Sequence, residues 1–481
     1  MANFITKSRL LSGLRCQKRL WLQTFERELA QESATSQLTI DAGIELGKFA
    51  RLNYPGGMLI GYVEDPGQAV LETSQLLGHR VPLFEAAFQH NDVLVRTDIL
   101  VPTDSGWRMV EVKSSGSVKD HHLIDCAVQL WVLENAGIPV QEISLAHVDT
   151  SFVYEGDGNY HALILEEDVT EKVRALLPDV PTWLVSHRDI LANSMPTVRM
   201  GRQCTNPDCQ FFAHCKKDLP EYPVTILPNA VKVIKELQDA GIEDIRDIPD
   251  GTLKNERHIR VWQVTRDNRP FISPQLKQEL ALLPYPRFYL DFETINLAIP
   301  RWKGTRPHQQ LPFQWSCHIE RADGTQEHTE FLDTSGNAPM RTFAESLIAA
   351  MENDGPIIVY GTFESTVLNK LNQFCPDLEA QLQNIIDRLV NLLPLLRSYY
   401  YHPAMKGSWS IKAVLPTVAP HLDYLQLDDV QNGTLAQMAY LEITDPKTDP
   451  IKRDQKIRNL LKYCELDTQA MVEVVRTFCV L

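Results

Sequence analysis

Residues 287–293 read Arg-Phe-Tyr-Leu-Asp-Phe-Glu, and this stretch decides the interpretation of the second half of the chain. Its large apolar side chains predict a buried strand. Asp291 and Glu293 lie two residues apart, so both carboxylates point to the same face of that strand. A buried pair of like charges is costly unless cations neutralise it. The stretch therefore predicts a strand that binds metal ions.

Further elements are expected around this strand. Strands at 313–319 and 356–360 alternate with helices at 338–353, 364–373 and 452–479, which predicts an α/β layer fold. In the last helix Tyr463 and Asp467 lie four residues apart, and hence on one helix face. That helix can bring a carboxylate to a metal and a phenol to a water molecule together.

These motifs resemble the DEDD exonucleases of the DnaQ group, in their tyrosine form, which have an RNase H-like fold. The resemblance covers residues 284–481 and rests on Asp-x-Glu at Asp291 and Tyr-x3-Asp at Tyr463. It implies that Asp291, Glu293 and Asp467 bind two Mg²⁺ or Mn²⁺ ions. It also implies that Tyr463 orients the nucleophile for 3'-to-5' removal of single nucleotides.

The middle motif of that family is less regular in this chain, which offers Tyr-Gly-Thr-Phe-Glu at 360–364. We expect Glu364 to be the ligand. Asp387 is the competitor, although its place between apolar residues suits an ordinary helix position or an ion pair with Arg388 equally well.

A basic loop follows the Asp-x-Glu strand at 300–310 and contains Arg301, Trp302, Lys303 and Arg306. Trp302 could stack on a base while the three cations meet phosphates. A merely solvated loop is the alternative. The position of the loop next to Asp291 in the sequence favours binding of a nucleic-acid strand.

A second pattern occurs in the first half, where residues 110–113 read Val-Glu-Val-Lys. Glu111 and Lys113 share one face of a strand, while the valines face the core. Asp98, on the preceding expected strand, adds a second carboxylate. Two carboxylates can hold Mg²⁺ or Mn²⁺ beside a phosphodiester, and Lys113 can polarise the attacking water. An exposed strand face with an ion pair is the alternative for Glu-Val-Lys alone.

This first half resembles the PD-(D/E)XK nucleases of the RecB type, which have a restriction-endonuclease-like fold. The resemblance covers about 215 residues and adds Glu85, before the strands, and Gln129, in the following helix. It implies that Asp98 and Glu111 bind metal, that Lys113 is catalytic and that Gln129 supports the site. Many relatives carry a metal-binding histidine on an early helix, where this chain has Gly47.

Four of the nine cysteines are grouped at metal-binding spacing: Cys204, Cys209 and Cys215 on one segment, with the distant Cys16 as the fourth. With His214 in place of Cys16, the segment could instead form a Cys3His zinc site. Cys16 resembles the lone early cysteine of iron-sulfur RecB-type exonucleases. That resemblance favours a [4Fe-4S] cluster over Zn²⁺ and implies a structural role.

Length and composition limit the remaining choices. A chain of 481 residues with 44% apolar residues predicts two domains and a connector. We expect a nuclease domain at 1–220, a helical connector at 221–283 and an exonuclease domain at 284–481. The connector contains a helix-hairpin-helix-like element, for which a plain helix-to-helix turn is the alternative. The net charge of −15 argues against indiscriminate binding of polyanions, but not against a nucleic-acid enzyme.

The sequence contains no run of 18 apolar residues and its N-terminus lacks the apolar core of a signal peptide, so we expect a cytoplasmic protein without membrane contact. The whole chain also resembles a bacterial family known only as a domain of unknown function, through Leu-Asp-Phe-Glu-Thr at 290–294 and Trp-Lys-Gly-Thr-Arg-Pro at 302–307.

Together the patterns predict a dual nuclease that acts on single-stranded DNA or DNA ends in DNA processing, repair or defence. One alternative is a nucleic-acid-binding protein, with one or both sites degenerate, that serves a defence or repair partner. Another is an RNA-processing exonuclease.

Overall fold

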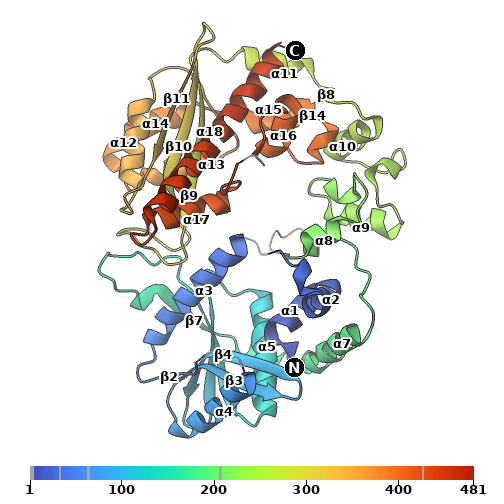
Figure 1. The fold of residues 1–481 in the computed structure, drawn as a ribbon, viewed down its shortest axis with the longest axis vertical. Coiled ribbons are helices and arrows are strands. Elements are labelled where there is room, and N and C mark those ends of the chain that lie inside the picture. Colours follow the sequence, from blue (N-terminus) through green and yellow to red (C-terminus); the bar gives the residue numbers. More distant parts are fainter. Residues whose placement is uncertain (1–4, 32–33, 62–64, 205–208, 425–426, 481) are drawn as a thin grey trace. The chain divides into compact units, whose positions relative to one another are not determined.

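The computed structural model describes residues 5–31, 34–61, 65–204, 209–424 and 427–480. The chain forms two compact units: unit 1 comprises residues 1–217 and 297–308, and unit 2 comprises residues 218–296 and 309–481. Each unit combines helices with a mixed sheet, so the expected α/β class is confirmed (Figure 1). Among the described helices, none has the length and apolarity needed to cross a membrane.

Unit 1 is built on a sheet with the order β2-β3-β4-β5-β6-β7, and β1 joins it beside β4. Strand β4 alternates buried and half-buried residues, as expected for a strand with one face on a core. The strands are β1 (Ile5–Thr6), β2 (Met58–Leu59), β3 (Leu83–His90), β4 (Val93–Pro102), β5 (Trp107–Lys113), β6 (Val140–Val148) and β7 (Ile164–Asp168).

Helix α5 packs on this sheet against β3 and β4 and contributes to the main core of unit 1. The helices are α1 (Lys7–Arg15), α2 (Gln17–Phe25), α3 (Ala34–Leu52), α4 (Pro66–Leu76), α5 (Asp120–Asn135), α6 (Thr170–Arg174), α7 (Val180–Ala192) and α8 (Phe212–Lys216).

Unit 2 is built on a sheet with the order β11-β10-β9-β12-β13. The central strand β9 is antiparallel to β10 and parallel to β12. A separate pair joins β8 to β14. The strands are β8 (Phe271–Ile272), β9 (Arg287–Asn296), β10 (Gln310–Glu320), β11 (Gln326–Leu332), β12 (Ile357–Val359), β13 (Leu389–Asn391) and β14 (Tyr400–Tyr401).

The two faces of this sheet carry different helices. Phe292 packs on Phe343 of α12, with 5.0 Å between ring centroids. Asp291, one residue earlier, faces the long helix α18, where its Oδ2 lies 3.7 Å from the Cys464 sulfur. The helices are α9 (Val231–Asp239), α10 (Glu256–Asp267), α11 (Pro274–Ala281), α12 (Met340–Ala350), α13 (Phe363–Leu371), α14 (Glu379–Asp387), α15 (Leu392–Tyr399), α16 (Ile411–Val418), α17 (Gly433–Thr444) and α18 (Pro450–Val480).

The expected connector, residues 221–283, belongs to unit 2, because its apolar side chains share one core with those of α15, α16 and α18. The segment expected to be helix-hairpin-helix-like begins with α9 and continues to Gly241, whose φ is +79°. A 3-10 turn at Ile245–Asp247 then stands where the second helix was expected. Asp244 is extended and pairs with Pro223, which prevents a second helix from starting there.

Candidate functional site

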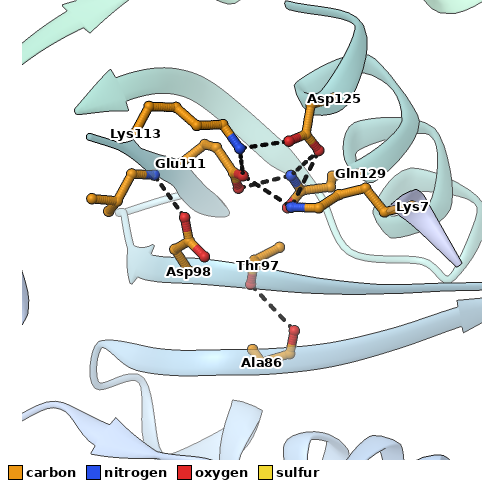
Figure 2. A network of polar contacts seen from close by, with 9 residues as sticks. Lys7, Ala86, Thr97, Asp98, Glu111, Lys113, Asp125 and Gln129 are labelled. Carbon is orange, nitrogen blue, oxygen red and sulfur yellow. Dashed lines mark hydrogen bonds and ion pairs between the residues drawn. The ribbon is translucent and has the colours of Figure 1, made fainter. Parts of the chain in front are cut away.

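The first carboxylate cluster lies in unit 1, at the adjacent strands β4 and β5 (Figure 2). Ile99 pairs with Val110, so Asp98 and Glu111 occupy the next positions along the two strands. Lys113 Nζ lies 2.7 Å from Glu111 Oε1. Gln129 on α5 donates to Glu111 Oε2 at 2.8 Å, and Asp98 Oδ2 accepts the Val112 N–H at 2.7 Å. The structure therefore brings together the four residues that the sequence predicted for this site, which are Asp98, Glu111, Lys113 and Gln129.

Two further residues complete this cluster, and sequence reasoning missed both. Lys7, at the start of α1, lies 2.9 Å from Glu111 Oε1 and 3.2 Å from Asp125 Oδ1. Asp125 also accepts from Lys113 at 2.7 Å (Figure 2). Asp125 lies four residues before Gln129, so helical spacing could have found it. Lys7 carries no such signal, because only the fold brings it to β5.

The charges of the first cluster nearly balance, with three carboxylates around two ammonium groups. Burial would raise the pKa of Glu111, but Lys113 and Lys7 outweigh it and hold that pKa below its ordinary value. Burial, with the charge of Glu111, raises the pKa of Asp98 to about 7. An added cation would therefore stabilise the charged form of Asp98.

A cavity of about 360 Å³ opens beside these side chains and is lined by Asp98, Glu111, Lys113, Glu85 and Gly47, among others. Glu85 lies within β3 rather than before it. Its φ of +57° interrupts the pairing of β3 with β4 between Phe84 and Ala86. A Cβ added at Gly47 would meet no described atom within 4 Å outside its own stretch of helix. A longer side chain at this position would therefore begin in open space beside the cavity.

The four grouped cysteines line one pocket in unit 1, together with the buried Leu22 and Phe211. Cys16 stands at the end of α1, and His214 is not among the described residues that line the pocket. Residues 205–208, between Cys204 and Cys209, lie outside the described part of the chain. The sequence therefore identified a set of thiols that the fold brings to one place.

The spacing of these thiols bears on what they could hold. Four thiolates around one Zn²⁺, at a Zn–S distance of about 2.3 Å, lie about 3.8 Å apart. Within the described residues, no three of these sulfur atoms lie within 4.8 Å of one another. In a cubane cluster each thiolate binds a different iron, so its sulfur atoms lie farther apart.

Residues 297–308, which include the four nominated residues of the basic loop, belong to unit 1, although they connect two strands of unit 2. Thr305 O accepts the Tyr154 N–H at 3.0 Å, and the Tyr160 hydroxyl donates to Pro300 O at 2.9 Å. His308 Nε2 lies 2.9 Å from the carbonyl of Ser114, the residue after Lys113. The structure thus places Arg301, Trp302, Lys303 and Arg306 with the strand of the first cluster rather than with the unit that holds Asp291.

The second carboxylate cluster lies in unit 2, between β9 and α18. Asp291, Glu293 and Asp467 each offer a carboxylate oxygen, and these atoms lie within 4.8 Å of one another. Glu364, in the first turn of α13, is 2% exposed, and its Oε2 has no hydrogen-bond partner among the described residues. The negative charge of Glu364 raises the pKa values of Asp291 and Glu293. The fold therefore gathers four carboxylates, one of them with an unpartnered oxygen.

The alternative middle ligand lies elsewhere. Asp387 is exposed at the end of α14 and accepts a hydrogen bond from Gln383, one turn earlier, at 2.7 Å. Its predicted partner Arg388 instead donates to backbone carbonyls, including Gly355 O at 2.8 Å. Between the two candidates, the geometry selects Glu364.

Tyr463 lies on α18 beside this cluster, and its oxygen accepts a hydrogen bond from Lys412 Nζ at 3.0 Å. Lys412 also donates to Gln431 O at 2.7 Å. The Tyr424 hydroxyl donates to Asp467 Oδ1. Sequence reasoning missed both Lys412 and Tyr424, because neither belongs to a spaced motif with the acidic residues.

The electrostatics of this second cluster differ from those of the first. Burial, followed by the charges of Asp467, Glu364 and Glu293, raises the pKa of Asp291 well above its ordinary value. Burial and Asp467 raise the pKa of Glu293 to about 8, and Lys412 opposes this shift. Burial raises the pKa of Glu364 to about 7. Within the described residues, Lys412 is the cation whose charge opposes these shifts at Glu293 and Asp467. One cation beside four carboxylates leaves a strong local excess of negative charge.

Comparison with known proteins gives two matches. A family model described as a domain of unknown function, DUF2779, matches residues 288–410, which include Asp291, Glu293 and Glu364. An uncharacterized protein of Ureaplasma parvum serovar 3 is 25% identical over 253 residues, which are 46% of this chain. The matched part spans about a third, 35%, of the length of that relative.

Proposed function

We propose that the protein is a metal-dependent nuclease whose second carboxylate cluster removes nucleotides from the 3' ends of single-stranded DNA or DNA ends. One observation carries this proposal. Four carboxylates, of which Glu293, Glu364 and Asp467 are buried, converge within unit 2, and the charges of Asp467 and Glu364 raise the pKa values of Asp291 and Glu293. Such an arrangement is costly for a folded protein unless divalent cations bind it. The resemblance to tyrosine-type DEDD exonucleases supplies the reaction.

The donor set fits the expected ions. Carboxylate oxygens are the ligands that Mg²⁺ and Mn²⁺ prefer, and the unpartnered Glu364 Oε2 is available to one of them. Asp291, Glu293, Glu364 and Asp467 would hold the metal. When bound, two such ions supply an activated water and stabilise the leaving oxygen of a phosphodiester.

The protein's own groups position the phenol and an acidic ligand of this cluster. Lys412 donates to the Tyr463 oxygen, and the Tyr463 hydroxyl hydrogen-bonds to Asp467, so the phenol is held beside a carboxylate that would bind the metal. Burial raises the pKa of Tyr463, which keeps this proton in place at neutral pH. The Tyr424 hydroxyl donates to Asp467 Oδ1, so two phenols hold this carboxylate in place. These contacts orient both the acidic ligand and the phenol.

A direct assay tests this proposal. The purified full-length chain is incubated with a 5'-labelled single strand and Mn²⁺, using DNA and RNA of the same sequence in parallel. We expect a ladder of products shortened one nucleotide at a time from the 3' end of the DNA. A ladder from RNA with intact DNA would support the RNA-processing alternative. Retention of both strands without cleavage would overturn the proposal.

The first cluster favours a second candidate function, which is binding of nucleic acid without cleavage. Glu111 already contacts two ammonium groups, and Gly47 stands where the resemblance implies a histidine ligand. Metal binding must therefore compete with Lys7 and Lys113. With the basic loop on the same unit, these lysines could hold phosphates instead.

Gly47→His tests whether this first cluster lacks only its histidine. The substitution adds an imidazole at a position where no described atom outside the helix lies within 4 Å of the new Cβ, beside the cavity that Asp98 lines. We expect Mn²⁺ affinity at this cluster to rise at least about tenfold, the typical effect of one well-placed group on a metal site. Isothermal titration with Mn²⁺, in an Asp291→Asn background, measures it.

Gly78→His provides the control, because Gly78 is exposed and equally open but is not among the described residues that line the cavity. It should therefore leave the affinity unchanged. Equal effects of the two substitutions would contradict the assignment of Gly47.

We also propose that Cys16, Cys204, Cys209 and Cys215 hold a [4Fe-4S] cluster. The support is their common pocket, its buried apolar neighbours and the resemblance of Cys16 to the lone early cysteine of iron-sulfur RecB-type exonucleases. The cluster would supply a structural cross-link between the end of α1 and the segment around α8. Such a link joins positions far apart in the chain and stabilises unit 1 by limiting its unfolded states.

Cys215→Ser should abolish the broad visible absorbance of the purified protein and destabilise unit 1 by roughly 2–4 kcal/mol, the range of one long-range cross-link. Iron, sulfide and zinc analysis with denaturant unfolding measures both effects. Cys479→Ser, in unit 2, is the control and should leave metal content unchanged. Stoichiometric zinc without iron in the wild-type protein would refute the cluster.

A further inference from the structure

Two histidines and a glutamate converge in unit 2 outside the carboxylate clusters. His318 on β10 and His328 on β11 are directly paired across the two strands, and their ring centroids are 4.5 Å apart. Glu465 reaches them from α18. One potential ligand atom of each residue lies within 4.8 Å of the other two. Two imidazoles with one carboxylate form a donor set that divalent transition metals commonly use.

Hydrogen bonds fix which nitrogen of each ring is available. The Thr468 hydroxyl donates to the Glu465 carbonyl at 2.9 Å, so it must accept from its two other neighbours. His318 Nδ1 and Ser316 Oγ are those neighbours, at 2.8 and 2.9 Å. Ser316 therefore donates its hydroxyl proton to Thr468. Its oxygen then accepts a hydrogen bond from His328 Nε2, at 2.9 Å.

This chain of donors leaves a lone pair on His318 Nε2 and another on His328 Nδ1. His328 Nδ1 lies 4.0 Å from Glu465 Oε1. That distance is too long for a hydrogen bond but close to the separation of two ligands on one ion, about 3–3.5 Å for metal–ligand bonds near 2.1 Å. Hydroxyl partners that hold the outer nitrogen of each imidazole are the usual second layer of a metal site.

The charges around the three residues are mixed. Burial, followed by the charges of His328 and Arg476, lowers the pKa of His318 to about 4. Glu330, two residues after His328 on β11, is exposed and adds a second carboxylate to this end of the two strands.

We propose that His318, His328 and Glu465 form a binding site for a divalent transition metal, with Zn²⁺ the best match to two imidazoles and one carboxylate. The ion would tie the edge strand β11 and its neighbour β10 to α18. Glu465 lies two residues from both Tyr463 and Asp467, so the ion would also fix the helix that presents them. The site does not depend on the nuclease proposal, because none of its ligands belongs to the carboxylate clusters.

Zinc titration of the chelator-treated full chain tests the site. Excess Mg²⁺ is present to occupy the oxygen-only sites. We compare the wild type with His328→Ala and Glu465→Gln, two exposed positions whose replacement should not disturb the core. We expect either substitution to remove one bound Zn²⁺ or to weaken it at least about tenfold. His79→Ala, an exposed histidine of unit 1, is the control.

Co²⁺ separates this site from the cysteine pocket. Cobalt bound to thiolates shows intense charge-transfer absorption in the near ultraviolet, whereas cobalt bound to imidazole and carboxylate shows only weak visible bands. The weak bands should disappear in His328→Ala while the thiolate bands remain. Unchanged zinc stoichiometry and affinity in both variants, with unchanged cobalt spectra, would overturn the proposal.

Discussion

Asp291→Asn is expected to abolish release of nucleotides from 3' ends while making the metal-free protein more stable. The loss of activity follows if Asp291 holds metal, because removing a charged ligand costs about 4 kcal/mol of transition-state stabilisation, or about 10³-fold in rate. The gain in stability follows because the amide removes one of four crowded charges. A purely structural carboxylate would not give this combination.

The pH at which stability is measured determines the size of this effect. The folded-state pKa of Glu293 is about 8, well above its ordinary value of 4.5. Between these values the folded protein retains a proton that the unfolded chain has released, so the free energy of unfolding falls as pH rises. The variant should therefore exceed the wild type most clearly near pH 8 in the presence of a chelator.

Thermal unfolding at pH 8, with a chelator and then with Mn²⁺, measures the effect. A gain of one kcal/mol corresponds to about 2–4 °C for a unit of this size. Added Mn²⁺ should stabilise the wild type more than the variant. Asp387→Asn is the matched control, since this exposed carboxylate should affect neither activity nor stability. Full activity of Asp291→Asn would refute the assignment of this cluster.

Glu111→Gln, the same type of substitution in the first cluster, is expected to destabilise unit 1 by about 3–5 kcal/mol. Glu111 is 1% exposed and contacts the ammonium groups of both Lys7 and Lys113. Loss of its charge leaves two cations in a buried site with Asp125 as their nearest remaining carboxylate. Denaturant unfolding, with hydrogen exchange of α1 and α5, measures the loss.

The sign of the pH dependence is opposite to that of the second cluster. The folded-state pKa of Glu111 is lowered, so its contribution to stability is present above its ordinary pKa of 4.5 and is lost as pH falls below it. The difference between wild type and variant should shrink in acid. Adding Lys7→Met to Glu111→Gln should restore part of the stability, because one uncompensated cation is then removed. Equal stability of Glu111→Gln and wild type at pH 7 would contradict the charge balance described here.

The opposite signs of these two effects could not be read from the sequence. Both clusters begin as acidic residues on strands, and strand periodicity places Asp291 with Glu293 and Glu111 with Lys113 on shared faces. Whether cations balance the negative charges of each cluster depends on residues from distant parts of the chain. Lys7 reaches Glu111 across 104 positions of the chain. In unit 2, Lys412 lies within hydrogen-bond reach of Tyr463, across 51 positions.

Other features of the site show the same limit. The middle motif left Glu364 and Asp387 open, because both lie next to apolar residues on helices. Only the packing of α13 shows that Glu364 is buried near the other acids while Asp387 is exposed. The basic loop follows Asp291 closely in sequence, yet residues 297–308 pack with unit 1. Proximity in sequence was therefore a poor guide to which site the loop serves.

By itself, the sequence determined the α/β class and the pairs of side chains that share one strand or helix face, because those depend on the local periodicities of 2 and 3.6 residues. It also identified the four cysteines, whose number and side-chain chemistry are local facts. The tertiary structure decided which cations balance which carboxylates and where the loop packs. It alone also brought His318, His328 and Glu465 together. Such contacts join residues tens to hundreds of positions apart, and local periodicity carries no information about how distant elements pack.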